Sequence, residues 1–139
     1  MIWQQQSVED EAHHLEIALP NTPSGASLAR KQLSSFARRL QLNPQIVADF
    51  ETAAGEALAN AAEHGCRFGG TIRLEAWITM AGIEAEISDD GPGFLPGPIP
   101  HVHQAAFAPR GYGLFIMQAL VDEIEFRNDG KTVWFLKRF

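Results

Sequence analysis

Several features that mark particular classes of protein are scarce or missing in this chain of 139 residues. A single cysteine, Cys66, excludes an internal disulfide and a cysteine metal cluster. No apolar run approaches the ~18 residues that a membrane-spanning helix needs. The first residues lack the basic segment and apolar stretch of a secretory signal. These absences predict a cytoplasmic protein with no membrane segment.

Positive charge is also in short supply. The chain has 11 lysines and arginines against 17 aspartates and glutamates, a formal net charge of −6. Such a surface repels a nucleic-acid backbone, so we expect no nucleic-acid partner. Hydrophobic residues make up 45% of the chain, enough for a sizeable core. The length fits one domain, residues 1–139, and the polar residues 1–12 read as a flexible N-terminal segment.

Hydrophobic spacing predicts strands and helices in a definite order. Alternating apolar residues predict five strands, at 15–19, 71–79, 83–87, 124–126 and 133–135. Cap and turn residues predict a first helix opening within 21–24, with Leu28, Leu33 and Phe36 facing inward, and a second running from Asn43-Pro44 to Gly65. A third is expected from about Gly111 to Val121. The order indicates an α+β two-layer sandwich, in which three helices cover one face of a mixed, largely antiparallel sheet.

Residues 91–113 follow neither the helix nor the strand period. They contain five prolines and five glycines. A stretch of this length inside a compact domain is more often a binding loop or lid than a plain connection. We therefore expect a lid at 95–110.

Three short motifs carry candidate chemistry. On the second helix Glu56, Asn60 and His64 recur at every fourth residue and share one stripe. Such a stripe alone is commonly a solvated face. However, Gly55 costs about 1 kcal/mol relative to alanine in mid-helix, which suggests that something packs closely there.

The other two motifs are rich in glycine. Asp89 ends a predicted strand and is followed by Gly91 and Gly93, so a carboxylate can enter a pocket while the backbone approaches a ligand. Gly111 and Gly113 open the third helix, where unpaired amides favour an anion. Each motif alone is weak, because Asp-Gly turns and glycine-led helices are common.

Taken in order, the three motifs resemble those of the GHKL ATPases, which have the Bergerat fold. The resemblance covers nearly the whole chain beyond residue 14. It is strongest to the bacterial anti-sigma-factor serine/threonine kinases of the RsbW type, through Glu56-Ala57-x-x-Asn60-Ala61-x-x-His64-Gly65 and the run from Gly111 to Ile116.

The resemblance implies a site for ATP and Mg²⁺. Asn60 would hold the Mg²⁺, and Asp89 would accept a hydrogen bond from the adenine amino group. Gly91 and Gly93 would let the chain pass close to the base. His64 would orient the phosphate end of the site or cap the helix.

At the phosphate end, the resemblance implies that Gly111 and Gly113 offer amides to the phosphates. Arg110 would steady the γ-phosphate, and Leu114 belongs to the same cofactor-binding run. Glu56 would act as the catalytic base that takes a proton from an attacking hydroxyl.

These assignments imply a protein serine/threonine kinase that acts as an anti-sigma factor. Its partners would be a sigma factor and an anti-sigma-factor antagonist protein that supplies the acceptor hydroxyl, and a homodimer is compatible with the family. Two alternatives stay open: a nucleotide-sensing module that sequesters a partner without catalysis, and a small α+β interaction domain that binds no nucleotide. No role follows for Glu63 or for the lid histidines His101 and His103.

Overall fold

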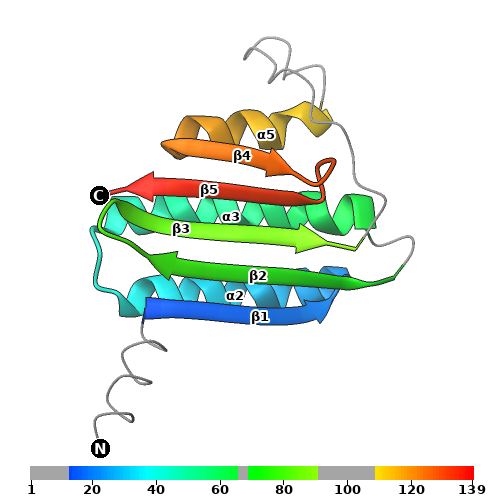
Figure 1. Ribbon diagram of the computed structural model, residues 1–139, viewed down its shortest axis with the longest axis horizontal. Coiled ribbons are helices and arrows are strands. Elements are labelled where there is room, and N and C mark those ends of the chain that lie inside the picture. The colour runs from blue at the N-terminus through cyan, green and yellow to red at the C-terminus, as the bar shows by residue number, and fades with distance from the viewer. Residues whose placement is uncertain (1–12, 66–68, 91–108) are drawn as a thin grey trace, which may run out of the picture.

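The computed structural model describes residues 13–65, 69–90 and 109–139 (Figure 1). It contains the eight expected helices and strands. In chain order they are β1 (His14–Pro20), α2 (Pro23–Arg39), α3 (Pro44–Gly65), β2 (Thr71–Ile78), β3 (Gly82–Asp89), α5 (Pro109–Leu120), β4 (Glu123–Arg127) and β5 (Thr132–Arg138).

The strands form one sheet in the order β1-β2-β3-β5-β4. All four neighbouring pairs in the described chain are antiparallel. The α+β class is confirmed, but the expected mixed sheet is wrong. The sheet is wholly antiparallel because hairpins form β2–β3 and β4–β5, and β5 then returns alongside β3.

The core lies between the sheet and the helices, which cover one sheet face (Figure 1). Phe50 of α3 meets Phe135 of β5 there, with ring centroids 5.5 Å apart. Alanines of α3 let this helix lie close to the sheet; Ala53, Ala54, Ala57 and Ala61 are all buried. Leu28, expected to face inward, is instead 44% exposed.

The helix starts follow their capping residues. Gly25 N donates to Thr22 Oγ1 at the start of α2, and Gln45 N donates to Asn43 Oδ1 at the start of α3, as the caps predict. Helix α5 starts at Pro109 rather than near Gly111, because proline suits the first helical position. None of the helices in the described segments has the length and apolar character needed to cross a membrane.

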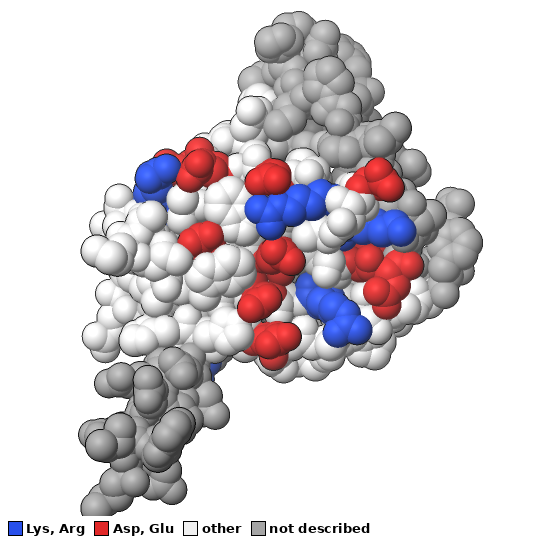
Figure 2. Space-filling view, viewed as in Figure 1, with Lys and Arg blue, Asp and Glu red and all other residues white. Residues whose placement is uncertain are grey.

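None of the described helices covers the other face of the sheet, which is called the open face below (Figure 1). Figure 2 shows this face, with acidic side chains following one another across its middle. Glu16, Glu75 and Glu86 stand in one row across β1, β2 and β3. Strand pairing therefore concentrates negative charge in the middle of the open face.

Candidate active site

Four elements meet at one end of the sheet, on the right in Figure 1. They are the C-terminal end of α3, the N-terminal end of α5, the end of β3 and the β4–β5 turn. The candidate residues on α3 lie at this junction. The site is thus built where a long helix, a strand end and a turn converge.

The Glu56–Asn60 stripe faces α5 rather than open solvent. Both side chains are partly buried. A Cβ atom placed on Gly113 would lie 2.9 Å from Glu56 Oε2 and 3.9 Å from Asn60 Oδ1. Because Gly113 has no side chain, the Glu56 carboxylate has space beside α5. The side-chain oxygens of Glu56 and Asn60 both lie next to this glycine.

Asn60 also lines a pocket between α3 and the sheet. Its walls are mostly apolar, and its polar groups come from Asn60, Asp89 and Lys131. The lining residues are Ala57, Asn60, Ala61, Ile87, Asp89, Phe126, Gly130, Lys131 and Val133. An apolar slot with a few convergent polar groups is the usual form of a small-molecule site.

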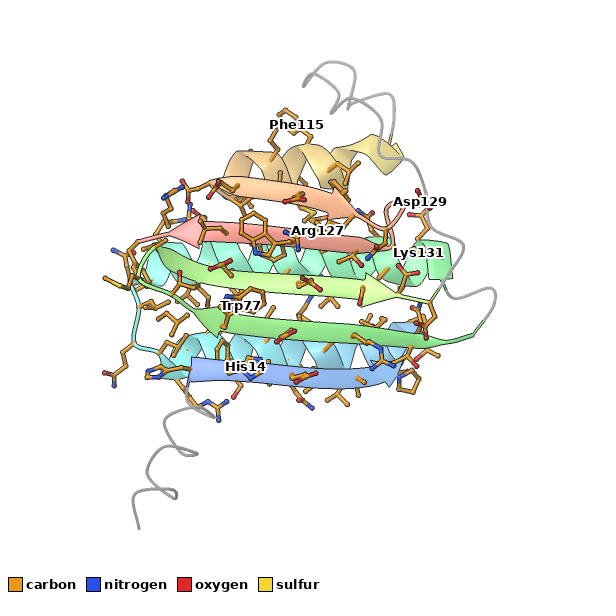
Figure 3. The ribbon with its side chains drawn as sticks, in the orientation of Figure 1. His14, Trp77, Phe115, Arg127, Asp129 and Lys131 are labelled. Atoms are coloured by element: carbon orange, nitrogen blue, oxygen red, sulfur yellow. The ribbon has the colours of Figure 1, made fainter. Side chains whose placement is uncertain are left out.

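Asp89 is placed by the sheet. It is the last residue of β3, and its N–H donates to the carbonyl of Lys131 at 3.0 Å. Figure 3 shows Asp129 and Lys131 at the β4–β5 turn beside this strand end. The turn itself depends on Asn128, Asp129 and Gly130, which all have positive φ. Strand pairing and turn geometry together fix the carboxylate at the pocket.

Comparison with known proteins identifies the family. The model of the histidine kinase-like ATPase domain matches residues 19–137. The chain belongs to this family.

Relatives of the domain carry regulatory names. The serine-protein kinase RsbW of Oceanobacillus iheyensis is 29% identical over 125 residues, which are 83% of this chain and 79% of the relative. The anti-sigma F factor of Thermoanaerobacter sp. (strain X514) is 30% identical over 118 residues, 80% of this chain and 81% of the relative.

A solved structure has the same fold. It contains the RsbU and RsbW domains of a Mycobacterium tuberculosis protein, with a TM-score of 0.68 and 24% identity. The match covers 90% of this chain and 32% of that one. The ATPase-like domain therefore spans about a third of that larger protein.

Within this ATPase domain the structure brings together some of the predicted site residues. Asn60 and Asp89 line one pocket, and Glu56 adjoins Asn60 at Gly113. Leu114 is buried on α5 and does not line that pocket. Gly113 is the fifth residue of α5, beyond the first four N–H groups that lack a partner within a helix.

Other predicted residues lie partly or wholly outside the described structure. Gly91, Gly93, His101, His103 and most of the lid at 95–110 fall in the undescribed segment. For His64, Arg110 and Gly111 the structure describes the helix backbone only. Glu63 is exposed.

Two contributors to the ATPase domain's architecture were not expected from the sequence. Buried Asn21 donates from Nδ2 to the carbonyl of Ala61 at 3.2 Å, tying the end of β1 to α3 beside Asn60. The sequence predicts Asn21 only as a cap or turn residue, although a polar side chain directly after a strand was an available signal. Lys131 was likewise not predicted as a pocket residue, because it follows a hairpin turn.

The close approach expected at Gly55 is made by Arg30 of α2. A Cβ atom on Gly55 would lie 2.5 Å from an Arg30 guanidinium nitrogen and 3.0 Å from its Cζ. The basic side chain therefore lies directly against α3, on the residue before Glu56. Sequence spacing indicated the approach but not its partner.

The donor set suits a nucleotide with a magnesium ion. Asn60 Oδ1 is a hard oxygen ligand of the kind Mg²⁺ prefers, and the Glu56 carboxylate beside it can accept a proton. Asp89 can accept from an amino group, and the apolar walls suit a flat ring. The described pocket is narrow, with about 10 Å³ of free space, room for one water molecule. Entry of a purine therefore requires its wall side chains to move apart.

Proposed function

We propose that this chain is an ATP-dependent serine/threonine protein kinase that acts as an anti-sigma regulatory factor. The observation that supports the proposal most directly is the placement of Glu56 and Asn60 together against Gly113. The names of the relatives, a serine-protein kinase and an anti-sigma factor, agree with this chemistry.

In the proposed complex the nucleotide spans the two parts of the site. Asp89 accepts from the adenine amino group, while Ala57, Ile87 and Val133 contact the ring. Asn60 would hold Mg²⁺, and the ion would supply neutralisation of the negative charge on the phosphates. We assign Gly111, at the start of α5, to offer its amide to the terminal phosphate, and Arg110 to supply a cation for the same phosphate.

Glu56 supplies the base for transfer. Its carboxylate takes the proton from a serine or threonine hydroxyl of a second protein. The hydroxyl oxygen forms a bond to the γ-phosphorus as the bond from that phosphorus to the bridging oxygen of ADP breaks. Phosphoryl transfer depends mainly on positioning and charge neutralisation, so one base beside a metal-binding amide is a sufficient protein contribution.

The acceptor is expected to be an anti-sigma-factor antagonist, and the competing partner a sigma factor. Phosphorylation of the antagonist would switch the kinase between the two partners. Capture of proteins from the native host with the full chain and Mg-ATP would supply the acceptor candidates.

Two measurements test the proposal. Calorimetry should detect Mg-ATP binding that Asp89→Asn reduces by about tenfold to a hundredfold, since a hydrogen bond to a charged acceptor contributes about 1.5–3 kcal/mol. Radiolabelled ATP should then label a serine or threonine of a captured protein. Binding without transfer to any captured partner would contradict the kinase and favour the non-catalytic sequestering module. Absence of ATP binding would contradict both.

A further inference from the structure

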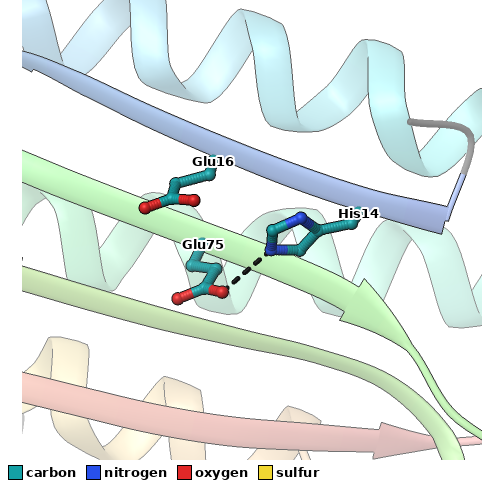
Figure 4. A group of neighbouring side chains, drawn as sticks. All are labelled: His14, Glu16 and Glu75. Carbon is teal, nitrogen blue, oxygen red and sulfur yellow. Dashed lines mark hydrogen bonds and ion pairs between the residues drawn. The ribbon is translucent and has the colours of Figure 1, made fainter. Parts of the chain in front are cut away.

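A second cluster of reactive side chains stands on the open sheet face. His14 and Glu16 occupy alternate positions of β1 and so point to the same side, and Glu75 of β2 is directly opposite Glu16. His14 Nε2 lies 2.8 Å from Glu75 Oε1 (Figure 4). One donor atom from each residue lies within 4.8 Å of the other two.

The register concentrates negative charge at this cluster. Glu16, Glu75 and Glu86 are directly opposite one another on three adjacent strands. Like charges in directly opposed positions destabilise a sheet. Arg127 pairs with Glu86 at 3.3 Å and Arg73 of β2 stands on the same face, so Glu16 and Glu75 have His14 and Arg73 as basic neighbours. A cation between these two carboxylates would remove the repulsion.

Space for an ion exists on the same face. A hollow of about 300 Å³ is lined by the carboxylates of this row and by neighbouring backbone and side chains. Its polar side chains are Glu16, Arg73, Glu75, Glu86 and Ser88. His14 stands next to it on β1.

We propose that His14, Glu16 and Glu75 form a binding site for a divalent transition-metal ion, with Zn²⁺ as the best match. One imidazole nitrogen and two carboxylate oxygens are typical zinc ligands, and the exposed face leaves the remaining positions to water. Mg²⁺ and Ca²⁺ favour all-oxygen sites, so the histidine selects against them.

The cluster needs a modest rearrangement to coordinate an ion. Zinc bonds of about 2.0–2.2 Å place ligand atoms roughly 3.3 Å apart, so the widest present spacing closes by at most about 1.5 Å. Glu16 and His14 are exposed, and rotation of these side chains provides that movement. Bonds from His14 and Glu75 to the metal replace their present hydrogen bond. The ion joins β1, an edge strand, to β2.

Calorimetric titration of the full chain with ZnCl₂ tests the site, and it does not depend on the proposed kinase activity. Loss of an outer-sphere partner costs metal affinity about 10–100-fold, so His14→Ala and Glu75→Gln should each weaken binding at least about tenfold. The matched control is His13→Ala, which removes the neighbouring exposed imidazole and should change the affinity less than about twofold. Equal zinc affinity in wild type and His14→Ala would overturn the proposal.

Amide NMR spectra locate the ion. Zinc should shift the signals of residues 14–17 and 74–77, and both sets of shifts should vanish in Glu75→Gln. Replacing one carboxylate of a repelling pair does not threaten the fold, so loss of the shifts reports the site. Shifts confined to the region of His101 and His103, or no shifts at all, would contradict the assignment.

Discussion

Helix α3 is approached differently on its two sides. On the α2 side, the absence of a side chain at Gly55 admits the guanidinium of Arg30. On the α5 side, the absence of a side chain at Gly113 admits the carboxylate of Glu56. Gly55 belongs to α3 itself, whereas Gly113 belongs to the neighbouring helix α5.

The two contacts indicate different roles: the contact at Gly55 packs two helices together, and the contact at Gly113 positions a reactive side chain. At Gly55 a side chain from another helix fills the space and lies against the backbone of α3. At Gly113 a side chain of α3 itself extends outward, next to Asn60 and the pocket of Asp89. We infer that the α5 side supports phosphoryl transfer and that the α2 side supports the position of the helix. Substitutions on the two sides should therefore affect different measurements.

The largest contrast is expected between Asn60→Ala and Arg30→Ala. Loss of Asn60 removes the proposed Mg²⁺ ligand, and metal stabilisation of phosphoryl transfer is worth several kcal/mol, so the transfer rate should fall by about a hundredfold or more. Arg30→Ala should leave Mg-ATP affinity within about twofold of wild type. Calorimetry and radiolabelled transfer measure both effects. Equal losses in the two variants would remove the distinction between the sides.

Gly113→Ala should have the next largest effect. The added methyl would lie 2.9 Å from Glu56 Oε2 and must displace the carboxylate. Since a displacement of about 1 Å can cost up to about a hundredfold, transfer should fall by about 10–100-fold. Thermal unfolding should show a stability change within about 1 kcal/mol. A wild-type transfer rate in Gly113→Ala would show that the exact position of the Glu56 carboxylate is not critical.

Gly55→Ala is the matched control on the other side. The new methyl would lie 2.5 Å from the end of the Arg30 side chain, which is long enough to move aside. Because alanine favours a helix over glycine, the free energy of unfolding should rise by up to about 1 kcal/mol. Transfer should stay within about twofold of wild type. A tenfold loss would place Arg30 among the groups that support transfer.

The smallest effect is expected at the start of α3. Asp49 forms a partly buried ion pair with Lys137 of β5 at 3.0 Å. Burial, the largest influence, raises the pKa of Asp49, but hydrogen bonds from Lys137 and Gln45 and the charge of Lys137 together lower that pKa below 3.8.

This lowered pKa sets a direction for acid unfolding. The stability from the carboxylate is present above the unfolded pKa, near 3.8, and is lost as the pH falls through the lower folded pKa. Asp49→Asn should therefore flatten the decline of stability below pH ~4, with a cost at neutral pH on the order of 1 kcal/mol. Denaturant titrations at several pH values measure this slope. An unchanged slope would show that the pair does not contribute.

Much of the fold follows from local sequence signals. The Asn43-Pro44 cap predicts the start of α3, because caps act over a few residues, and alternating apolar residues predict the last two strands. The insertion of β5 between β3 and β4 depends on pairing between distant segments, so local pattern did not give it. Helix α5 starts two residues before the expected Gly111, because proline suits the first helical position.

The candidate site was predictable only in part. Helical spacing placed Glu56 and Asn60 on one stripe, and strand prediction put Asp89 at a strand end. What each side chain meets depends on packing between elements. That is why the contact of Gly113 with Glu56, the position of Arg30 and the bond from Asn21 to Ala61 appeared only in three dimensions.

The most direct test separates ATP binding from phosphoryl transfer in Glu56→Gln. Glutamine keeps the size of the side chain but cannot take a proton. We expect Mg-ATP affinity within about threefold of wild type and transfer to the protein acceptor reduced by about 10²–10⁴-fold, the usual contribution of a general base. Full transfer activity in this variant would contradict the central claim that Glu56, held beside Asn60 and Gly113, is the catalytic base.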